Sequence, residues 1–129
     1  MVASQTPGAP QMKYALLFTE TDSKFAERSD AKKAEPYRAA WGAYIGAIHQ
    51  AGIVVAGSGL EPPHTATTIR IRDGKRDVQD GPYADAKEQL GGFFVIDVPH
   101  LDAALEWAAR SPSASYGAVE VRPVMVMPA

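Results

Sequence analysis

The stretch GGFFVIDVPHLDAALEWAARS, residues 91–111, decides the fold class of this chain. Its segment Phe93–Val98 is apolar at every position but Asp97, which indicates a strand inside a sheet or covered on both faces. The next segment, residues 101–110, ends before Pro112 and has apolar residues on one side of a helix: Leu101, Ala104, Leu105 and Ala108. A buried strand that leads into an amphipathic helix indicates half of a split βαβ arrangement.

The same pattern occurs in the first half of the chain. Residues 12–19, MKYALLFT, alternate as a strand does, and residues 36–51 carry an apolar helical stripe that stops before Gly52. Residues 53–56 and 119–127 are the strands expected after the two helices. We therefore predict two βαβ halves, which make a ferredoxin-like α+β domain, βαββαβ, with both helices on one face of an antiparallel sheet.

An inserted β-hairpin is predicted between the two halves. Residues 67–72 and 76–79 flank Asp73-Gly74, a pair that favours a two-residue turn. Gly57-Ser58-Gly59 is expected to break the second strand. Residues 84–90 are expected to form a short helical turn before the glycines that follow.

The predicted sheet is apolar on both faces. Along the first strand, Tyr14, Leu16 and Phe18 lie opposite Ala15 and Leu17. Helices cover one face only, so a second subunit stacked on the open face would bury the other. Two-fold dimers are the commonest closed assembly, and we predict a homodimer.

Composition limits the classes of function. The 129 residues fit one domain, and 46% hydrophobic with 22% charged residues is typical of a globular protein. The net charge of −2 provides no positive field for phosphates, so no direct nucleic-acid partner is expected. The chain has no cysteine, which excludes disulfides and thiolate sites and fits a reducing compartment.

The N-terminal residues and the hydropathy of the chain bear on its location. No run approaches the ~18 apolar residues that span a bilayer, and residues 1–11 lack the apolar stretch of a signal peptide. We expect a flexible N-terminal lead over residues 1–11, one domain over residues 12–129, a cytoplasmic location and no membrane partner.

A turn motif and the segment after it resemble a known family. Asp80-Gly81-Pro82-Tyr83 is followed at fixed spacing by KEQLGG, residues 87–92. Residues 80–111, and most of residues 12–125, resemble the DGPF-motif branch of the YCII-related family, with Tyr83 in the place of phenylalanine. The resemblance implies a dimeric α/β barrel built from ferredoxin-like subunits.

What the resemblance implies about function is limited. Some relatives resemble barrels that act on chlorinated or oxygenated aromatics with a His-Asp pair, and this sequence has no clear counterpart of that histidine. Members of the DGPF branch are also associated with extracytoplasmic-function sigma factors, which implies a possible interaction module in their regulation.

The densest group of titratable residues lies beside the glycines of this motif. Asp80 and Lys87 are candidate catalytic residues there, and a further set is a candidate ligand-binding group: Tyr83, Glu88, Gly91, Gly92 and Glu120. The alternative is structural: Asp80 caps its turn, Lys87 is solvated, and the glycines serve a bulge.

His49 is the third candidate catalytic residue. It shares one helical face with Gly42 and Gly46, and those glycines suggest close packing or a cavity beside the histidine. The alternative is a solvated surface histidine, because acid–base catalysis needs a partner that the sequence does not identify.

No metal site and no cofactor are expected. The histidines at 49, 64 and 100 do not have the spacing of a helical metal site. Three functions follow as hypotheses: a homodimeric small-molecule-binding or accessory domain, a cofactor-free enzyme with proton-transfer or lyase-type chemistry, and the sigma-factor module. Whether the protein is an enzyme stays open at this point.

Overall fold

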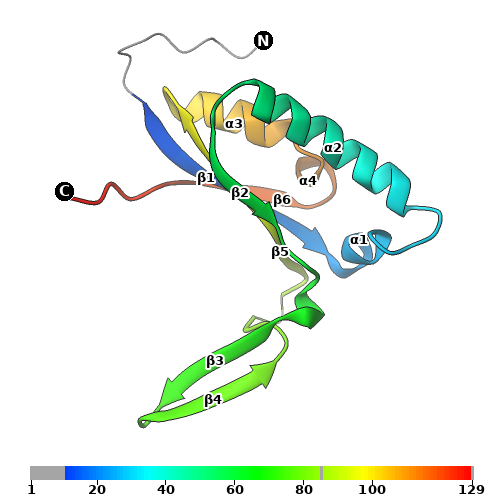
Figure 1. The fold of residues 1–129 in the computed structure, drawn as a ribbon, viewed down its shortest axis with the longest axis vertical. Coiled ribbons are helices and arrows are strands. Elements are labelled where there is room, and N and C mark those ends of the chain that lie inside the picture. The colour runs from blue at the N-terminus through cyan, green and yellow to red at the C-terminus, as the bar shows by residue number, and fades with distance from the viewer. Residues whose placement is uncertain (1–10, 85, 129) are drawn as a thin grey trace.

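The fold, described here from a computed structural model, covers residues 11–84 and 86–128 (Figure 1). The N-terminal lead predicted for residues 1–11 lies, except for Gln11, outside the described residues. The helices are α1 Asp22–Glu27, α2 Ala34–Gln50, the short 3₁₀ helix η1 Pro63–Thr65, α3 Leu101–Ala109 and α4 Ser113–Tyr116. The strands are β1 Met12–Thr21, β2 Val54–Gly59, β3 Thr67–Arg72, β4 Lys75–Asp80, β5 Glu88–Val98 and β6 Ala118–Pro123.

The main sheet has four strands in the order β2-β5-β1-β6, and all of its neighbouring strands are antiparallel. Helices α2 and α3 lie on the same side of this sheet (Figure 1). This arrangement confirms the predicted ferredoxin-like α+β fold with an inserted hairpin. The dimeric barrel stays a prediction.

The core lies between the helices and one face of the sheet. Alternate residues of β1 and β5 point into it, because successive side chains of a strand point to opposite faces. Its fully buried members include Leu16, Ile48, Ile96 and Trp107. Phe18 packs edge-to-face on Trp41, Tyr44 and Phe94, with ring centroids 5.2, 5.9 and 6.0 Å away.

Helix α1 forms in a polar segment where the sequence predicted no element. The Oγ1 atom of Thr21 caps it by accepting a hydrogen bond from the backbone N–H of Lys24 at 3.4 Å. Phe25 is its buried residue, 4% exposed. One capped turn and one buried aromatic side chain therefore position α1 at the end of β1.

Strand β2 is longer than predicted, because Gly57-Ser58-Gly59 continues the strand and does not break it. These residues pair with Phe94, Phe93 and Gly92 of β5. A Cβ atom at Gly57 would lie 2.2 Å from Cδ1 of Phe94. Glycine is required there because the Phe94 ring lies against the backbone of β2.

The helical turn predicted for residues 84–90 is wrong for the described part of that segment. Residues 84 and 86–87 have no helical structure, and Glu88 begins β5 by pairing with Thr21. The side-chain amide of Gln89 donates to the carbonyls of Ala84 and Ala86 at 2.6 and 3.2 Å. Strand pairing and these side-chain bonds replace helical hydrogen bonds.

The last strand is shorter than predicted, because β6 ends at Pro123 and not at Met127. Residues 124–128 continue without regular structure. Pro123 has no N–H to donate to the neighbouring strand β1. The N–H of the next residue, Val124, donates to the carbonyl of Lys13 at 2.9 Å.

Strands β3 and β4 form a separate two-stranded arm that projects from the body (Figure 1). The predicted Asp73-Gly74 turn closes its tip, with φ angles of 51° and 76°. One face of the arm carries Ile69, Ile71 and Val78, which are 53%, 57% and 55% exposed. None of the described helices is long and apolar enough to cross a membrane.

Candidate functional site

A groove of about 360 Å³ lies between α2 and the strands β2 and β5. Four residues of α2, spaced four apart, line its helical wall: Tyr37, Trp41, Ile45 and His49. At 1.5 Å per residue this wall extends about 18 Å along the helix. The volume is within the range of small-molecule sites, which are concave and mostly apolar.

Glycines form much of the opposite wall of the groove. Gly57, Gly59, Gly91 and Gly92 line it together with the aromatic residues Phe18, Phe93 and Phe94. A Cβ atom built on Gly59 meets no atom within 4 Å. The groove is therefore open partly because these strand positions carry no side chains.

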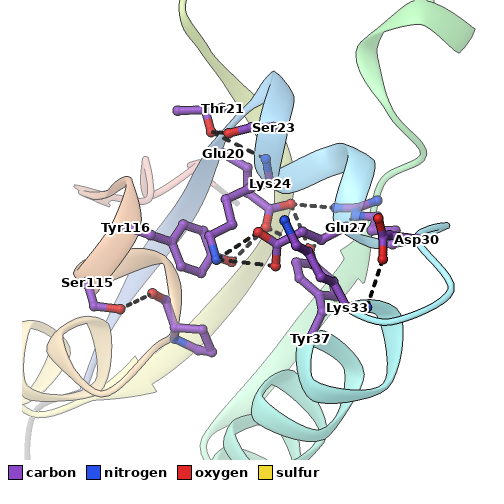
Figure 2. A network of polar contacts seen from close by, with 12 residues as sticks. Glu20, Thr21, Ser23, Lys24, Glu27, Asp30, Lys33, Tyr37, Ser115 and Tyr116 are labelled. Atoms are coloured by element: carbon purple, nitrogen blue, oxygen red, sulfur yellow. Dashed lines mark hydrogen bonds and ion pairs between the residues drawn. The ribbon is translucent and has the colours of Figure 1, made fainter.

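A buried carboxylate lies at one end of the groove. Glu20, near the end of β1, is 1% exposed, although the next residue, Thr21, already caps α1. Tyr37 donates to its Oε1 and Oε2 atoms at 2.8 and 2.6 Å, and Tyr116 donates to Oε2 at 2.6 Å (Figure 2). The Nη2 atom of Arg28 donates to Oε1 at 2.8 Å. We call Glu20, Arg28, Tyr37 and Tyr116 the Glu20 cluster.

Arg28 joins this cluster to the wall of the groove. Its Nε atom donates to the hydroxyl of Tyr37 at 3.1 Å, and its Nη2 atom also donates to the carbonyl of Gly91 at 3.3 Å. Its Nη1 atom donates to the carbonyl of Leu60. Burial disfavours the charged guanidinium, but the hydrogen bonds to Tyr37 and Glu20 outweigh burial and raise the pKa of Arg28.

The tyrosines of the cluster are neutral hydrogen-bond donors. Burial, and then the hydrogen bond to Glu20, raises the pKa of Tyr37 to about 12. The same two causes raise the pKa of Tyr116. The indole N–H of Trp41 donates to the hydroxyl of Tyr116 at 2.9 Å and so connects the groove wall to the far side of the cluster.

A second hollow, of about 580 Å³, lies on the other side of Tyr37 and Trp41. Charged and hydroxyl-bearing surface residues make up much of its lining, including Lys24, Glu27 and Arg110. Lys24 and Glu27 pair with each other at 3.1 Å. This hollow shares aromatic residues with the groove but has no glycine among the described residues of its lining and more charged and hydroxyl-bearing side chains, so the groove is the better candidate site.

Three of the residues predicted from the sequence line the groove. His49 lies at the end opposite Arg28 along α2, and its ring packs edge-to-face on Phe94 with a centroid distance of 5.6 Å. Gly91 and Gly92 lie in β5 on the opposite wall. Gly42 and Gly46, for which close packing or a cavity was predicted, are exposed with nothing within 4 Å of a Cβ atom among the described residues, and the groove beside His49 is not lined by either of them.

The other predicted residues do not line the groove. Asp80 and Tyr83 lie at the base of the arm, where Gly81 at φ 96° donates its N–H to the carbonyl of Ala66 at 2.7 Å. Tyr83 is 71% exposed, and the Arg70 guanidinium lies 4.7 Å from its ring centroid. The structure does not bring Asp80 to His49, and the roles predicted for Asp80 and Tyr83 stay predictions.

Lys87, Glu88 and Glu120 are exposed and lie apart from the groove lining. Glu88 accepts a hydrogen bond from Thr19 at 3.3 Å. Glu120 pairs with Arg122 of the same strand at 2.5 Å on the face opposite the helices. No group of three or more His, Asp or Glu side chains in the described residues could hold a metal ion.

The Glu20 cluster was not predicted from the sequence. Glu20 continues the alternation of Tyr14, Leu16 and Phe18, so its inward direction could have been inferred from the period of the strand. Tyr37 was assigned to an apolar stripe. Tyr116 carries no sequence signal, because α4 is a single turn whose position depends on packing.

Comparisons with known proteins assign the family. The family model described as the YCII-related domain matches residues 12–128. An uncharacterised protein of Rhizobium meliloti (strain 1021) is 46% identical over 67 residues, which cover 50% of this chain and 54% of the relative. The chain thus spans about half the length of this curated relative.

Proposed function

This chain belongs to the YCII-related domain family, and we propose that it binds a small, largely apolar molecule in the groove between α2, β2 and β5. The observation that carries the proposal is the combination of aromatic walls with a glycine-lined opposite side. Few polar side chains border the groove: Arg28 lies at one end, His49 at the other, and Ser58 on the strand wall between them. Such an arrangement favours an apolar body with polar ends.

A volume-filling substitution tests the proposal. Gly59→Leu places a side chain where a Cβ atom meets nothing within 4 Å, so it fills the groove without displacing a neighbour near that Cβ. We expect compounds from an aromatic fragment set to raise the Tm of the native protein and not that of Gly59→Leu. Gly42→Ala on the exposed side of α2 is the matched control and is expected to behave as the native protein does. Compounds that stabilise native protein and Gly59→Leu equally would rule out the groove as the binding site.

A homodimer is the second part of the proposal. The sheet face away from the helices carries the cross-strand pairs Leu17–Phe93 and Ala15–Val95, and all four residues are partly exposed. Stacking this face on a second copy would remove that apolar area from water. We expect light scattering to give the mass of a dimer for the native protein and of a monomer for Val95→Lys. Circular dichroism should show that Val95→Lys is folded. A native monomer at micromolar concentration would contradict this part.

His49 supports proton-transfer chemistry as a second candidate function. Its imidazole lines the groove, and histidine is the side chain whose unperturbed pKa suits acid–base chemistry near neutral pH. The test is exchange of the methyl protons of acetophenone in deuterium oxide, followed by NMR. We expect the native protein to exceed buffer and His49→Gln to fall to the buffer rate. Equal rates for native protein and buffer would exclude this chemistry on that probe.

A further inference from the structure

The hydrogen-bonding capacity of Arg28 indicates which ligand the groove accepts at its inner end. A guanidinium has five N–H groups. Among the described residues, Tyr37 takes the Nε–H, Glu20 and Gly91 take both Nη2 hydrogens, and Leu60 takes one of the two on Nη1. One N–H of Nη1 is left over on a side chain that lines the groove.

One spare N–H does not match a carboxylate. A guanidinium binds a carboxylate tightly through two parallel N–H···O bonds, and this needs two free hydrogens on one edge. Four of the five N–H groups of Arg28 are already engaged, by Tyr37, Glu20, Gly91 and Leu60, so two free hydrogens are not available. A single carbonyl oxygen needs only one donor.

The charge at this end of the groove leads to the same conclusion. Glu20 lies 2.8 Å from Arg28, so the pair contributes no net charge toward a ligand. A ligand carboxylate beside Arg28 would add a second negative charge near the buried one, and like charges in one site disfavour binding. An uncharged acceptor avoids this repulsion.

We propose that the groove selects uncharged aromatic or similarly flat compounds that present one carbonyl oxygen to Arg28, and that it rejects the corresponding carboxylates. The Glu20 carboxylate is the specificity-determining group, because it engages Arg28 and supplies the repelling charge. This inference rests on the proposed function of the groove and adds the chemical class of its ligand.

A matched pair of probes tests the inference on the native protein. 2-Naphthamide and 2-naphthoate have the same rings. At pH 7.5 the amide group of the first is uncharged and the carboxylate of the second is ionised. We expect naphthamide to bind at least about tenfold more tightly by calorimetry or NMR titration, because juxtaposed like charges weaken binding strongly. Naphthoate binding as tightly as naphthamide, or more tightly, would overturn the inference.

The charge-removing variant Glu20→Gln supplies the second test. It keeps the shape of the side chain and leaves the Arg28 charge uncompensated. The ratio of the affinity for naphthamide to the affinity for naphthoate should therefore fall toward one or below it. Circular dichroism and a Tm measurement check that this variant is folded, and the native comparison decides the question if it is not. An unchanged ratio in folded Glu20→Gln would contradict the assigned role of Glu20.

Failure of the inference can be told apart from failure of the proposed function. If naphthoate binds native protein well and Gly59→Leu abolishes that binding, the groove is a ligand site and only the ligand class is wrong. If neither probe binds, but other fragments bind the native protein and not Gly59→Leu, the ligand class is again wrong. If no fragment distinguishes native protein from Gly59→Leu, the proposed function itself fails.

Discussion

Gly91→Ala is the substitution whose effect the structure defines most sharply. A Cβ atom at this position would lie 2.8 Å from Oε1 of Glu20, 3.2 Å from Nη2 of Arg28 and 3.3 Å from Cε1 of Phe25. Each contact is with a side chain, which could normally move aside. Here the carboxylate is fixed by hydrogen bonds from three side chains, and moving it would weaken those bonds.

The expected cost follows from these contacts. Overpacking a buried site costs about 1–3 kcal/mol, and weakening a hydrogen bond to a charged group costs about 1.5–3 kcal/mol. Replacing glycine by alanine restricts the unfolded chain and returns about 0.4–1 kcal/mol. We expect a net loss of about 3.5 kcal/mol in the free energy of unfolding, which for a chain of this length lowers the Tm by about 13 °C.

Urea denaturation at one fixed protein concentration measures this loss, because the stability of a dimer would depend on concentration. Gly59→Ala is the matched control: it lies in the neighbouring strand, and its Cβ atom meets nothing within 4 Å. The control is expected to stay within about 1 kcal/mol of the native protein. A Gly91→Ala protein as stable as the native one, or a control that loses as much, would show that the Glu20 carboxylate does not resist the added methyl group.

Three further predictions concern the Glu20 cluster, α2 and the arm. Because the pKa of Tyr37 is raised from 10.0 to about 12, its contribution to stability is complete below pH 10 and is lost as the pH rises to 12, since the unfolded chain releases its proton first. Tyr37→Phe should therefore reduce the fall in urea midpoint between pH 10 and 12, and Tyr83→Phe, at a ring 71% exposed, should leave the fall unchanged. Gly46→Ala should raise the free energy of unfolding by about 1 kcal/mol, because the site is an exposed helix interior with open space around it; a loss of stability would show that another surface packs there. Replacing residues 67–80 by Asn-Gly should change the Tm by only a few degrees, because the N–H of Gly81 donates to the carbonyl of Ala66 at 2.7 Å and so already joins the two ends; an unfolded product would show that the arm supports the body.

The sequence predicted those parts of the fold that depend on local pattern. The alternation of residues 12–19, the stripe of residues 36–51 and the Asp73-Gly74 turn each determine a structure through neighbouring residues alone. The errors occurred where contacts distant in sequence decide. Gly57-Ser58-Gly59 is an ordinary strand breaker until the Phe94 ring is placed against it.

The candidate site was less predictable than the fold for a related reason. Its residues come from β1, α2, β2, β5, α4 and the position just after α1, and no two of those in the Glu20 cluster are closer than eight positions in the sequence. The Asp80-Gly81-Pro82-Tyr83 motif is conspicuous in the sequence because its turn restricts residue type. It lies at the base of the arm, whereas the groove is made of residue types that occur throughout ordinary cores.

The Glu20 cluster and the groove depend on each other. Moving α2 onto β2 and β5 would close the groove, but Tyr37 would then withdraw its hydrogen bonds from a carboxylate that is 1% exposed, and losing a hydrogen bond to a buried charge is costly. The cluster therefore sets the separation between helix and strands as well as the charge beside the ligand. Truncating the side chain of Glu20 or Tyr37 changes both properties together, whereas Glu20→Gln keeps the shape of the side chain and changes its charge. Gly59→Leu changes volume alone, so comparing it with Glu20→Gln separates the effect of space from the effect of charge on ligand binding.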